Sequence, residues 1–446
     1  MKSLRTSRTV YWLPAGLIVL ASAVRLFVCL QHNPMDYMFS DSATHWMEGT
    51  HFPKGGYGGA ANPILYQLYI FVLHKLTADN KVLIGLVSGF LSVAMPWTYY
   101  RAARTFGMRK NAALWVWALI GWTPSSIAIY HYLMMETLLL PLEGAALWMT
   151  ARYLRKGGGE PFLTAVVVWT AACLTKPTVF PLALICLLWG GWKKSPSLRD
   201  IALATGVVVV LLLPQTLRTE VALGFAAPFG NPWLVKIQHR SGAKTLYVNF
   251  YTHQNRFVHV EAQPLYQMFF RSPSTSVQPL QPLSDWSMRR AHGDSHLTIS
   301  IDSAYGARDW KRAYASLNVS RKEWVSQWGE NIVLFLFAPS FPESVVPEWD
   351  GRLEYATRWM WAPLIALVLI PNLRHFVNRR FGLIPVAVTL FALFLGLQNS
   401  ATFEGRYRKP LEPLLLLNLV WIGVRSDEAK LSTEIQSVGS RVVGTT

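Results

Sequence analysis

The chain is a succession of apolar blocks separated by short polar links. A helix rises about 1.5 Å per residue, so about 20 apolar residues cross the 30 Å hydrocarbon core of a membrane. The blocks therefore predict transmembrane helices, and the shorter ones are expected to extend into the neighbouring links. The predicted spans are Tyr11–Leu30, Val82–Tyr99, Asn111–Trp122, Met134–Ala151, Leu163–Leu174, Phe180–Trp192, Ile201–Pro214, Tyr355–Ile370, Phe381–Leu397 and Leu411–Val424.

Two further apolar segments predict helices that lie in the membrane interface. Asn62–Leu76 has a polar stripe and the interfacial anchors Tyr66, Tyr69 and Lys75. If this segment were a full span, every later link would lie on the opposite side of the membrane. The charge pattern described below argues against that arrangement. Trp324–Phe337 is interpreted in the same way and leads into the last three predicted spans.

Composition supports a membrane protein and excludes other classes. Of the 446 residues, 52% are hydrophobic and only 15% are charged, with a mean hydropathy of +0.24, which is too apolar for a soluble globular protein. Cys29, Cys173 and Cys186 all lie inside apolar blocks. A disulfide framework or a cysteine-based metal site is therefore not expected.

The net charge of +17 is explained by the links rather than by nucleic-acid binding. No basic–aromatic binding motif accompanies the charge, so no nucleic-acid partner is expected. Lys and Arg accumulate instead on alternate short links, as the positive-inside rule requires of cytoplasmic loops. With both termini in the cytoplasm, the link that follows the first span faces outward. The basic links carry Arg101, Arg104, Arg109, Lys110, Arg152, Arg155, Lys156, Lys193, Lys194, Arg199, Arg374, Arg379 and Arg380.

These patterns predict an all-α polytopic membrane protein with about ten transmembrane helices, interface helices and one large outer (periplasmic) loop domain. Residues 1–216 form an N-terminal transmembrane module whose first outer loop is 31–81. Residues 217–330 are polar and irregular and form the large outer loop. A C-terminal module, 331–425, and a cytoplasmic tail, 426–446, complete the chain.

Ionisable residues gather near the predicted outer face. Burying such residues in or near the membrane costs free energy, so their presence there indicates a functional role. A carboxylate there suits a general base, and cations suit a phosphate group that leaves with negative charge. Each also has a structural explanation, such as helix capping for Asp41, snorkelling for Arg25 and helix packing for Glu136. The acids are Asp36, Asp41, Glu136 and Glu404, and the cations are Arg25, Lys176, Arg406 and Arg408.

The order of several short motifs resembles the C-type (GT-C) membrane glycosyltransferases, particularly the branch of protein O-mannosyltransferases and lipid A aminoarabinose transferases. The resemblance covers roughly residues 10–215 and 355–425 and leaves 217–330 unmatched. The motifs are Arg25 near the end of the first span, Asp41-Ser-Ala-Thr-His45-Trp46, Asn62-Pro63-Ile64-Leu65-Tyr66, Thr175-Lys176-Pro177-Thr178 and Arg406-Tyr407-Arg408-Lys409-Pro410.

This resemblance implies an active site on the outer face of the membrane. The lack of disulfide-capable cysteines on the outer side favours a bacterial inner membrane over the endoplasmic reticulum. Asp41 would be the catalytic base, and Lys176, Arg406, Arg408 and Arg25 would bind the phosphate of a polyprenyl-phosphate sugar donor. Transfer to a lipid, glycan or protein acceptor would invert the sugar's anomeric centre. No cofactor or metal site is assigned, but many relatives have two adjacent acids where this chain has Asp41 and Ser42, so a divalent metal stays an open alternative.

Three other functions are compatible with the same pattern, and one of them, a non-catalytic scaffold or receptor, would depend on no outer acid. An O-antigen ligase or polymerase that uses a polyprenyl-diphosphate glycan would depend on loop arginines such as Arg289 or Arg312 instead of Asp41. A secondary transporter would show a repeat between its halves and ionisable groups at broken spans near the midplane. No such repeat is visible in the sequence.

Overall fold

The computed structural model describes most of the N-terminal half and the helices of the C-terminal part. The described residues are 6–36, 38, 40–53, 62–223, 226–230, 246–251, 256–262, 275–279, 332, 335–336, 348–377, 382–397 and 408–424. Of the predicted interface helix Trp324–Phe337, only three residues fall within these ranges.

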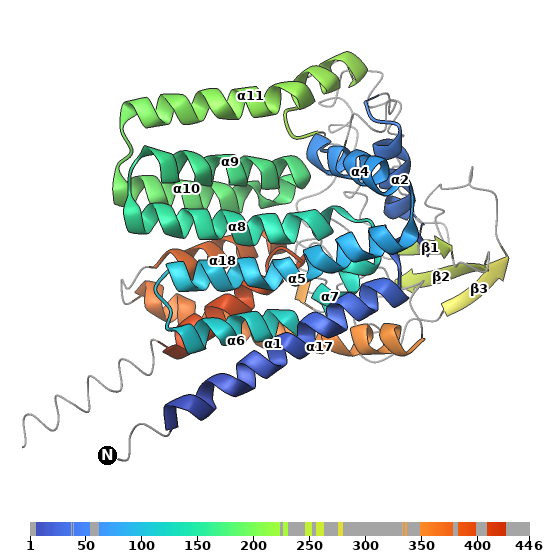
Figure 1. The fold of residues 1–446 in the computed structure, drawn as a ribbon, viewed down its shortest axis with the longest axis horizontal. Helices are drawn as coiled ribbons and strands as arrows, with labels where there is room; N and C mark the ends of the chain where they lie inside the picture. The colour runs from blue at the N-terminus through green and yellow to red at the C-terminus, as the bar shows by residue number, and fades with distance from the viewer. Residues whose placement is uncertain are drawn as a thin grey trace, which may run out of the picture.

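The N-terminal part of the chain is a run of helices joined by short turns (Figure 1). Each of the seven spans predicted here coincides with a helix, and the predicted interface helix coincides with α4. The helices are α1 (Thr6–Gln31), η1 (Pro34–Asp36), α2 (Ser40–Thr50), α4 (Ile64–Thr77), α5 (Lys81–Thr105), α6 (Lys110–Gly121), α7 (Pro124–Ala128), η2 (Ile129–His131), α8 (Met135–Lys156), α9 (Gly159–Thr175), η3 (Pro177–Val179), α10 (Phe180–Lys194) and α11 (Leu198–Leu223).

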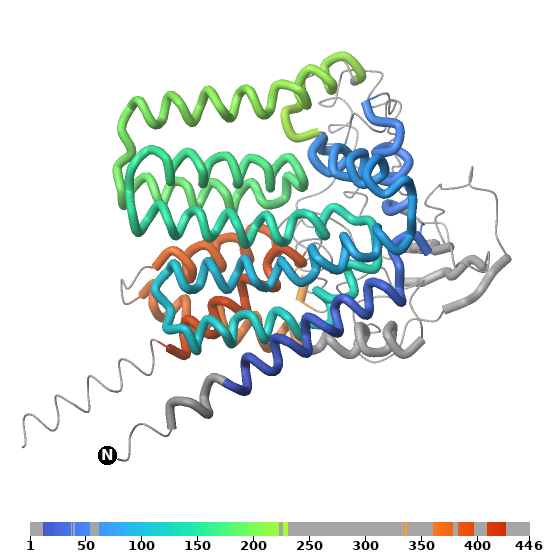
Figure 2. The backbone as a smooth tube through the Cα atoms, in the orientation of Figure 1, coloured from blue at the N-terminus to red at the C-terminus, as the bar shows by residue number. Residues whose placement is uncertain are grey.

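The C-terminal part adds α17 (Glu348–Val377), α18 (Leu383–Leu397) and a last helix, Glu412–Val424, again at the three predicted positions. Figure 2 shows these segments, coloured orange to red, lying against helices from the first half of the chain. The contacts run from α18 to α10 and from α17 to α7. The bundle is therefore all helical, as predicted, and its two halves pack on one another.

Four described helices are long and apolar enough to cross a membrane: Trp12–Asp36, Lys81–Thr105, Leu198–Ala222 and Met360–Val377. A fifth span results if Lys110–Gly121 and Pro124–His131, bent by 65°, are counted together. Other apolar helices, such as Gly159–Thr175, are shorter than the roughly 20 residues that 30 Å of hydrocarbon requires. The protein is thus a helical bundle with several apolar helices compatible with a membrane, and ten spans stay a prediction.

Segment 217–330 contains more regular structure than the irregular loop predicted for it. Three strands, β1 (Leu246–Tyr251), β2 (Arg256–Ala262) and β3 (Thr275–Pro279), form an antiparallel sheet in the order β1-β2-β3. Aromatic and β-branched residues dominate β1 and the start of β2, which favours extended chain. The start of this segment is also helical, because α11 continues through Pro214 to Leu223 instead of ending at the proline.

Helices α5 and α8 lie at the centre of the bundle and pack closely on each other. A Cβ atom at Gly144 of α8 would lie 2.1 Å from Thr98 Oγ1 of α5, so only glycine permits this crossing. The surrounding core includes Tyr99, Leu140 and Trp169. Small residues at helix crossings allow backbones to approach closely in the way typical of membrane helices.

The alternating helices give the bundle two chemically different ends. The turns after α5, α8 and α10 lie together at the left of Figure 1, and they carry the basic links of the sequence; we call this the basic end. Helices α2 and α4 lie at the opposite end, which we call the α2–α4 end. The predicted inner links of the N-terminal part therefore share one end of the bundle.

Candidate functional site

Helix α2 carries the acid that the sequence singles out. Asp41 is half-buried and lies in the first turn of α2, where the positive end of the helix dipole favours a carboxylate. His45 and Glu48 follow at i+4 and i+7, which places all three on one face of the helix. His45 and Glu48 are buried, so this face leads from the half-buried Asp41 into the protein.

Amide side chains hold the buried Glu48 carboxylate. Asn62 Nδ2 donates to Glu48 Oε1 at 3.0 Å and to Oε2 at 2.9 Å, and Gln67 Nε2 donates to Oε2 at 2.9 Å. His45 Nδ1 lies 4.0 Å from Oε2. Because a buried carboxylate needs hydrogen-bond partners, these neutral donors stabilise Glu48 inside the protein. Glu48 was not among the sequence candidates, and its i+7 spacing from Asp41 is the signal that could have found it.

Tyr66 of α4 joins α2 to the start of α8. Its ring meets the His45 ring edge-on, with centroids 5.3 Å apart. Burial raises the pKa of the Tyr66 phenol well above its usual value; Tyr69 and Glu136 raise it further, while the Thr137 hydroxyl lowers it. Tyr66 therefore stays neutral and lies between the face that bears His45 and the acid Glu136.

Two predicted site residues, Glu136 and Lys176, come together at this point. Lys176 Nζ donates to Glu136 Oε1 at 2.5 Å, and both side chains are buried. Glu136 lies in the first turn of α8, and Lys176 lies between α9 and η3. Helix α4 contacts both α2 and α9, so this ion pair and Asp41 belong to the same end of the bundle.

Arg25 is engaged inside the bundle at every nitrogen. Nε donates to Gly121 O at 2.8 Å, Nη1 to Ser92 O and Oγ at 2.9 Å and to Ser126 O at 3.3 Å, and Nη2 to Ile120 O and Ser126 Oγ. The carbonyls belong to the C-terminal end of α6, to α5 and to α7. As the predicted phosphate ligand, Arg25 would have to release one of these bonds.

Arg408 belongs to a buried network that joins the two halves of the chain. Its Nε donates to Glu412 Oε1 at 3.3 Å, its Nη1 donates to Phe335 O, and its guanidinium lies 5.4 Å from the Trp361 ring centroid. Burial lowers the pKa of Arg408, and the Glu412 carboxylate opposes this shift. A phosphate would have to compete with these internal partners.

The same network includes three residues that were not among the predicted site residues. Lys409 Nζ donates to Ser125 O, and Ser125 Oγ donates to Glu412 Oε2 at 2.7 Å. Ser125 lies in α7, far away in the sequence from the last helix. The i+4 spacing of Arg408 and Glu412 could have indicated their ion pair, but nothing local indicates Ser125.

The remaining predicted residues divide into two groups. Asp36 forms an exposed ion pair with Lys81, which ties η1 to the start of α5. Arg406 and Glu404 lie outside the described residues. Within the described ranges, no group of three His, Cys, Asp or Glu side chains is arranged to hold a metal ion.

Arg218 is a cation at this end that the sequence predictions did not include. It lies near the end of α11, in the part predicted to be a loop. Its guanidinium is 5.6 Å from the Phe52 ring centroid, and the charge of Glu48 acts on it. Nη1 and Nη2 are buried and have no hydrogen-bond partner among the described residues.

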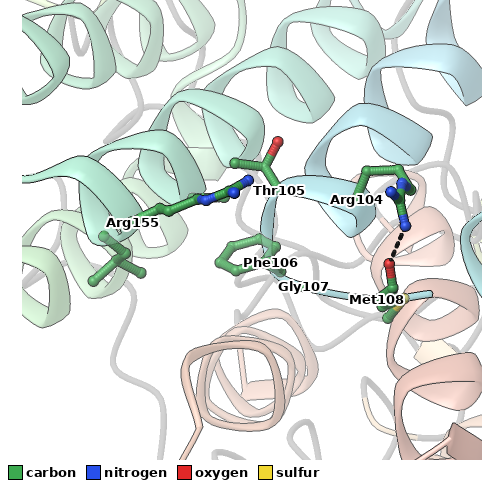
Figure 3. A pocket seen from close by; sticks show the side chains of 8 residues that line it. Arg104, Thr105, Phe106, Gly107, Met108 and Arg155 are labelled. Carbon is green, nitrogen blue, oxygen red and sulfur yellow. Dashed lines mark hydrogen bonds between the residues drawn. The ribbon is translucent and has the colours of Figure 1, made fainter. Parts of the chain in front are cut away.

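A pocket of about 560 Å³ lies at the opposite, basic end of the bundle (Figure 3). It is lined by Arg104, Thr105, Phe106, Gly107, Met108, Ala151, Leu154 and Arg155. Arg104 Nη1 donates to Met108 O at 2.6 Å across its rim. The arginines here are accounted for by the basic links of the positive-inside pattern, and none of the predicted site residues lines the pocket.

Comparisons with protein-family models, with curated proteins and with solved structures found no match. The resemblance to C-type glycosyltransferases therefore rests on the quoted motifs.

Proposed function

We propose that the chain is an integral-membrane glycosyltransferase that moves a sugar from a polyprenyl-phosphate donor to an acceptor on the outer face of the membrane. The observation that carries this proposal is the packing of α2 on α4 and of α4 on α9. This packing places the acid Asp41 at the same end of the bundle as the Glu136–Lys176 pair. The order of motifs in the sequence supplies the reaction class.

The proposed reaction is a single displacement. Asp41 removes the proton from the acceptor as its oxygen or nitrogen attacks the anomeric carbon, and the bond from that carbon to the phosphate oxygen breaks. Polyprenyl phosphate is the leaving group, and cations at this end of the bundle stabilise the negative charge that develops on its phosphate. Attack opposite the leaving group inverts the anomeric centre.

The two ends of the bundle support the orientation that this reaction needs. The basic links favour the cytoplasmic side, so the α2–α4 end would face outward, with about ten spans and both termini inside. In this orientation α4 lies in the outer interface with its exposed Leu68, Val72 and Leu76 toward lipid. We place the protein in the bacterial inner membrane.

The test is mass spectrometry of polyprenyl-phosphate sugars and glycosylated acceptors in cells that make the wild type, Asp41→Asn, Asp36→Asn or no protein. We expect Asp41→Asn to lower transfer by about 100-fold or more, as for loss of a general base, with the lipid-linked sugar accumulating. Asp36→Asn is the matched control, because Asp36 is an exposed acid of the same loop that pairs with Lys81.

The outcomes separate the alternatives. Normal transfer by a well-expressed Asp41→Asn protein, with a defect only in cells without the protein, would exclude the base mechanism and favour the arginine-dependent ligase. No difference among all the strains would favour a transporter. Chelation of divalent metals before the assay decides whether a metal takes part, since a metal-dependent transfer would stop.

A further inference from the structure

The cations that the sequence predicts as phosphate ligands are already engaged by the protein. Arg25 donates to backbone carbonyls and serine hydroxyls, Lys176 pairs with Glu136, and Arg408 pairs with Glu412. An anion at any of these three cations would compete with the internal partners. Arg218 differs, because the described residues provide no hydrogen-bond partner for its Nη1 and Nη2 atoms.

The surroundings hold the Arg218 backbone in place. The Thr219 hydroxyl accepts a bond from Ala227 N at 2.8 Å and lies 3.2 Å from Ala227 O. The same short segment contacts α10, because the rings of Phe229 and Phe180 lie 5.6 Å apart. The end of α11 is therefore attached to the bundle and lies near α2 and α4 (Figure 1).

Neighbouring side chains steady the guanidinium without using its terminal donors. Phe52 presents its ring at 5.6 Å, and Glu48 supplies a negative charge nearby. The Glu48 oxygens, however, accept their hydrogen bonds from Asn62 and Gln67. Buried donors without acceptors are costly, and a planar guanidinium fork matches two oxygens of a phosphate.

The environment beside Arg218 is apolar and exposed. On α11, Leu217 is 55% exposed and Val221 is 87% exposed, and Val210 and Leu213 continue this exposed apolar stripe. The helix is one of those long and apolar enough to cross a membrane. An anion that reaches Arg218 along this helix would arrive from lipid.

We infer that Arg218 binds the phosphate group of a lipid-linked ligand through Nη1 and Nη2. This inference rests on the proposed function, in which the ligand is the polyprenyl-phosphate sugar. Phe52 and Glu48 position the guanidinium, and the exposed stripe of α11 contacts the hydrocarbon chain. Arg218 is then a residue that binds the sugar donor.

The experiment measures binding to the full-length protein in nanodiscs, with undecaprenyl phosphate and undecaprenol as paired probes. The ratio of the two affinities isolates the contribution of the phosphate group. The variants are Arg218→Gln and the matched control Arg199→Gln, an exposed arginine in the first turn of the same helix. Inorganic phosphate, added as a competitor, separates a lipid site from a site for free phosphate.

We expect the wild type and Arg199→Gln to prefer undecaprenyl phosphate over undecaprenol. Arg218→Gln should lower this preference by about tenfold or more, because it loses hydrogen bonds to a charged group. Inorganic phosphate should compete weakly. If Arg218→Gln fails to fold, Arg218→Lys keeps the charge beside Glu48 but loses the two-pronged contact, and we expect it to lower the preference as well.

Several results would overturn the inference. One is a folded Arg218→Gln protein with an unchanged preference, which would leave Arg218 as a structural counter-charge of Glu48. Equal binding of both probes by the wild type, or strong competition by inorganic phosphate, would exclude a lipid-phosphate site.

The two proposals can fail separately. If Asp41→Asn stops transfer while Arg218→Gln binds like the wild type, the transferase stands and the Arg218 site fails. If Arg218→Gln loses the preference while Asp41→Asn transfers normally, the Arg218 site stands and the transferase mechanism fails.

Discussion

Glu48 and Lys176 illustrate, at the scale of single residues, two ways in which this protein buries a charge. The Glu48 carboxylate accepts hydrogen bonds from the neutral amides of Asn62 and Gln67, and its charge acts on Arg218. Lys176 is paired with the carboxylate of Glu136, so the charges of this pair sum to zero. Lys176 Nζ donates to Glu136, whereas Nη1 and Nη2 of Arg218 have no hydrogen-bond partner among the described residues, and this difference favours Arg218 over Lys176 as a ligand-binding cation.

The Glu136–Lys176 pair makes a prediction about stability. Lys176→Met leaves the Glu136 carboxylate in a buried place without its cation, which should cost about 3–5 kcal/mol of the free energy of unfolding. Replacing both residues by Met should cost much less, because no charge is then left without its partner. Thermal unfolding of the purified variants in detergent measures both effects.

Activity of the same variants separates structure from ligand binding. If Lys176→Met is as stable as the wild type but transfers no sugar, Lys176 binds the sugar donor, as the sequence motif predicts. Its pairing with Glu136 is then not needed for stability. If the double variant is as unstable as the single one, the ion pair is not what stabilises this turn.

Helix α2 shows, at the scale of elements, how a short polar helix is placed. Its own composition gives it no apolar face of the kind that the spans have. It packs on α4 because Gly49 lets the backbones approach: a Cβ at Gly49 would lie 2.4 Å from Ile70 Cβ. The position of Asp41 therefore depends on a glycine two turns away along the helix.

Gly49→Ala tests this dependence. The added methyl group should push α2 away from α4 and lower the free energy of unfolding by about 1–3 kcal/mol, with a loss of transfer activity. Gly16→Ala is the matched control, because a Cβ at this helical glycine meets nothing within 4 Å. Thermal unfolding and the transfer assay measure the two effects. A stable and active Gly49→Ala protein would show that the contact with Ile70 does not position Asp41.

Helix α11 shows where local sequence rules mislead. Pro214 predicts the end of a span, since proline removes a backbone donor and disfavours the helical conformation before it. The helix nevertheless continues to Leu223, as membrane helices tolerate proline when neighbouring groups satisfy the backbone. Because the helix continues, Arg218 lies in α11 and not in the predicted loop.

The whole molecule has one strongly basic end and one end that carries Asp41, Glu48 and Arg218. The two halves of the chain are joined by the network of Ser125, Lys409 and Glu412. The proposed orientation follows from the distribution of charge between the ends and predicts which residues are reached from outside the cell.

Single cysteines introduced at Lys81 and Lys110, on opposite ends of the bundle, test the orientation. We expect a membrane-impermeant maleimide to label Lys81→Cys in intact cells and Lys110→Cys only after the membrane is opened. Cys29, Cys173 and Cys186 are buried, so their background labelling should be low. Labelling in the reverse order would place Asp41 on the cytoplasmic side and exclude the proposed function.

The sequence by itself determined the helices of the bundle. All ten predicted spans and the interface segment Asn62–Leu76 coincide with helices, because long apolar runs and the helical rise are local properties of the chain. The clustering of basic links at one end follows from the same alternation of spans and turns. The sheet in 217–330 was missed because its short strands stand among polar residues with no long alternating pattern.

Only the tertiary structure decided which polar groups are engaged. Arg25, Lys176, Arg408 and Arg218 look alike in the sequence, as single cations near the ends of apolar blocks. Their partners come from distant segments: Arg25 bonds Ser126 and Lys176 bonds Glu136. Arg218 differs, because the described residues offer no hydrogen-bond partner to its Nη1 and Nη2. Helical periodicity relates only residues a few positions apart in the sequence. The hydrogen-bond partners of a buried side chain depend instead on how whole helices pack. That packing therefore distinguishes a structural cation from a candidate ligand-binding one.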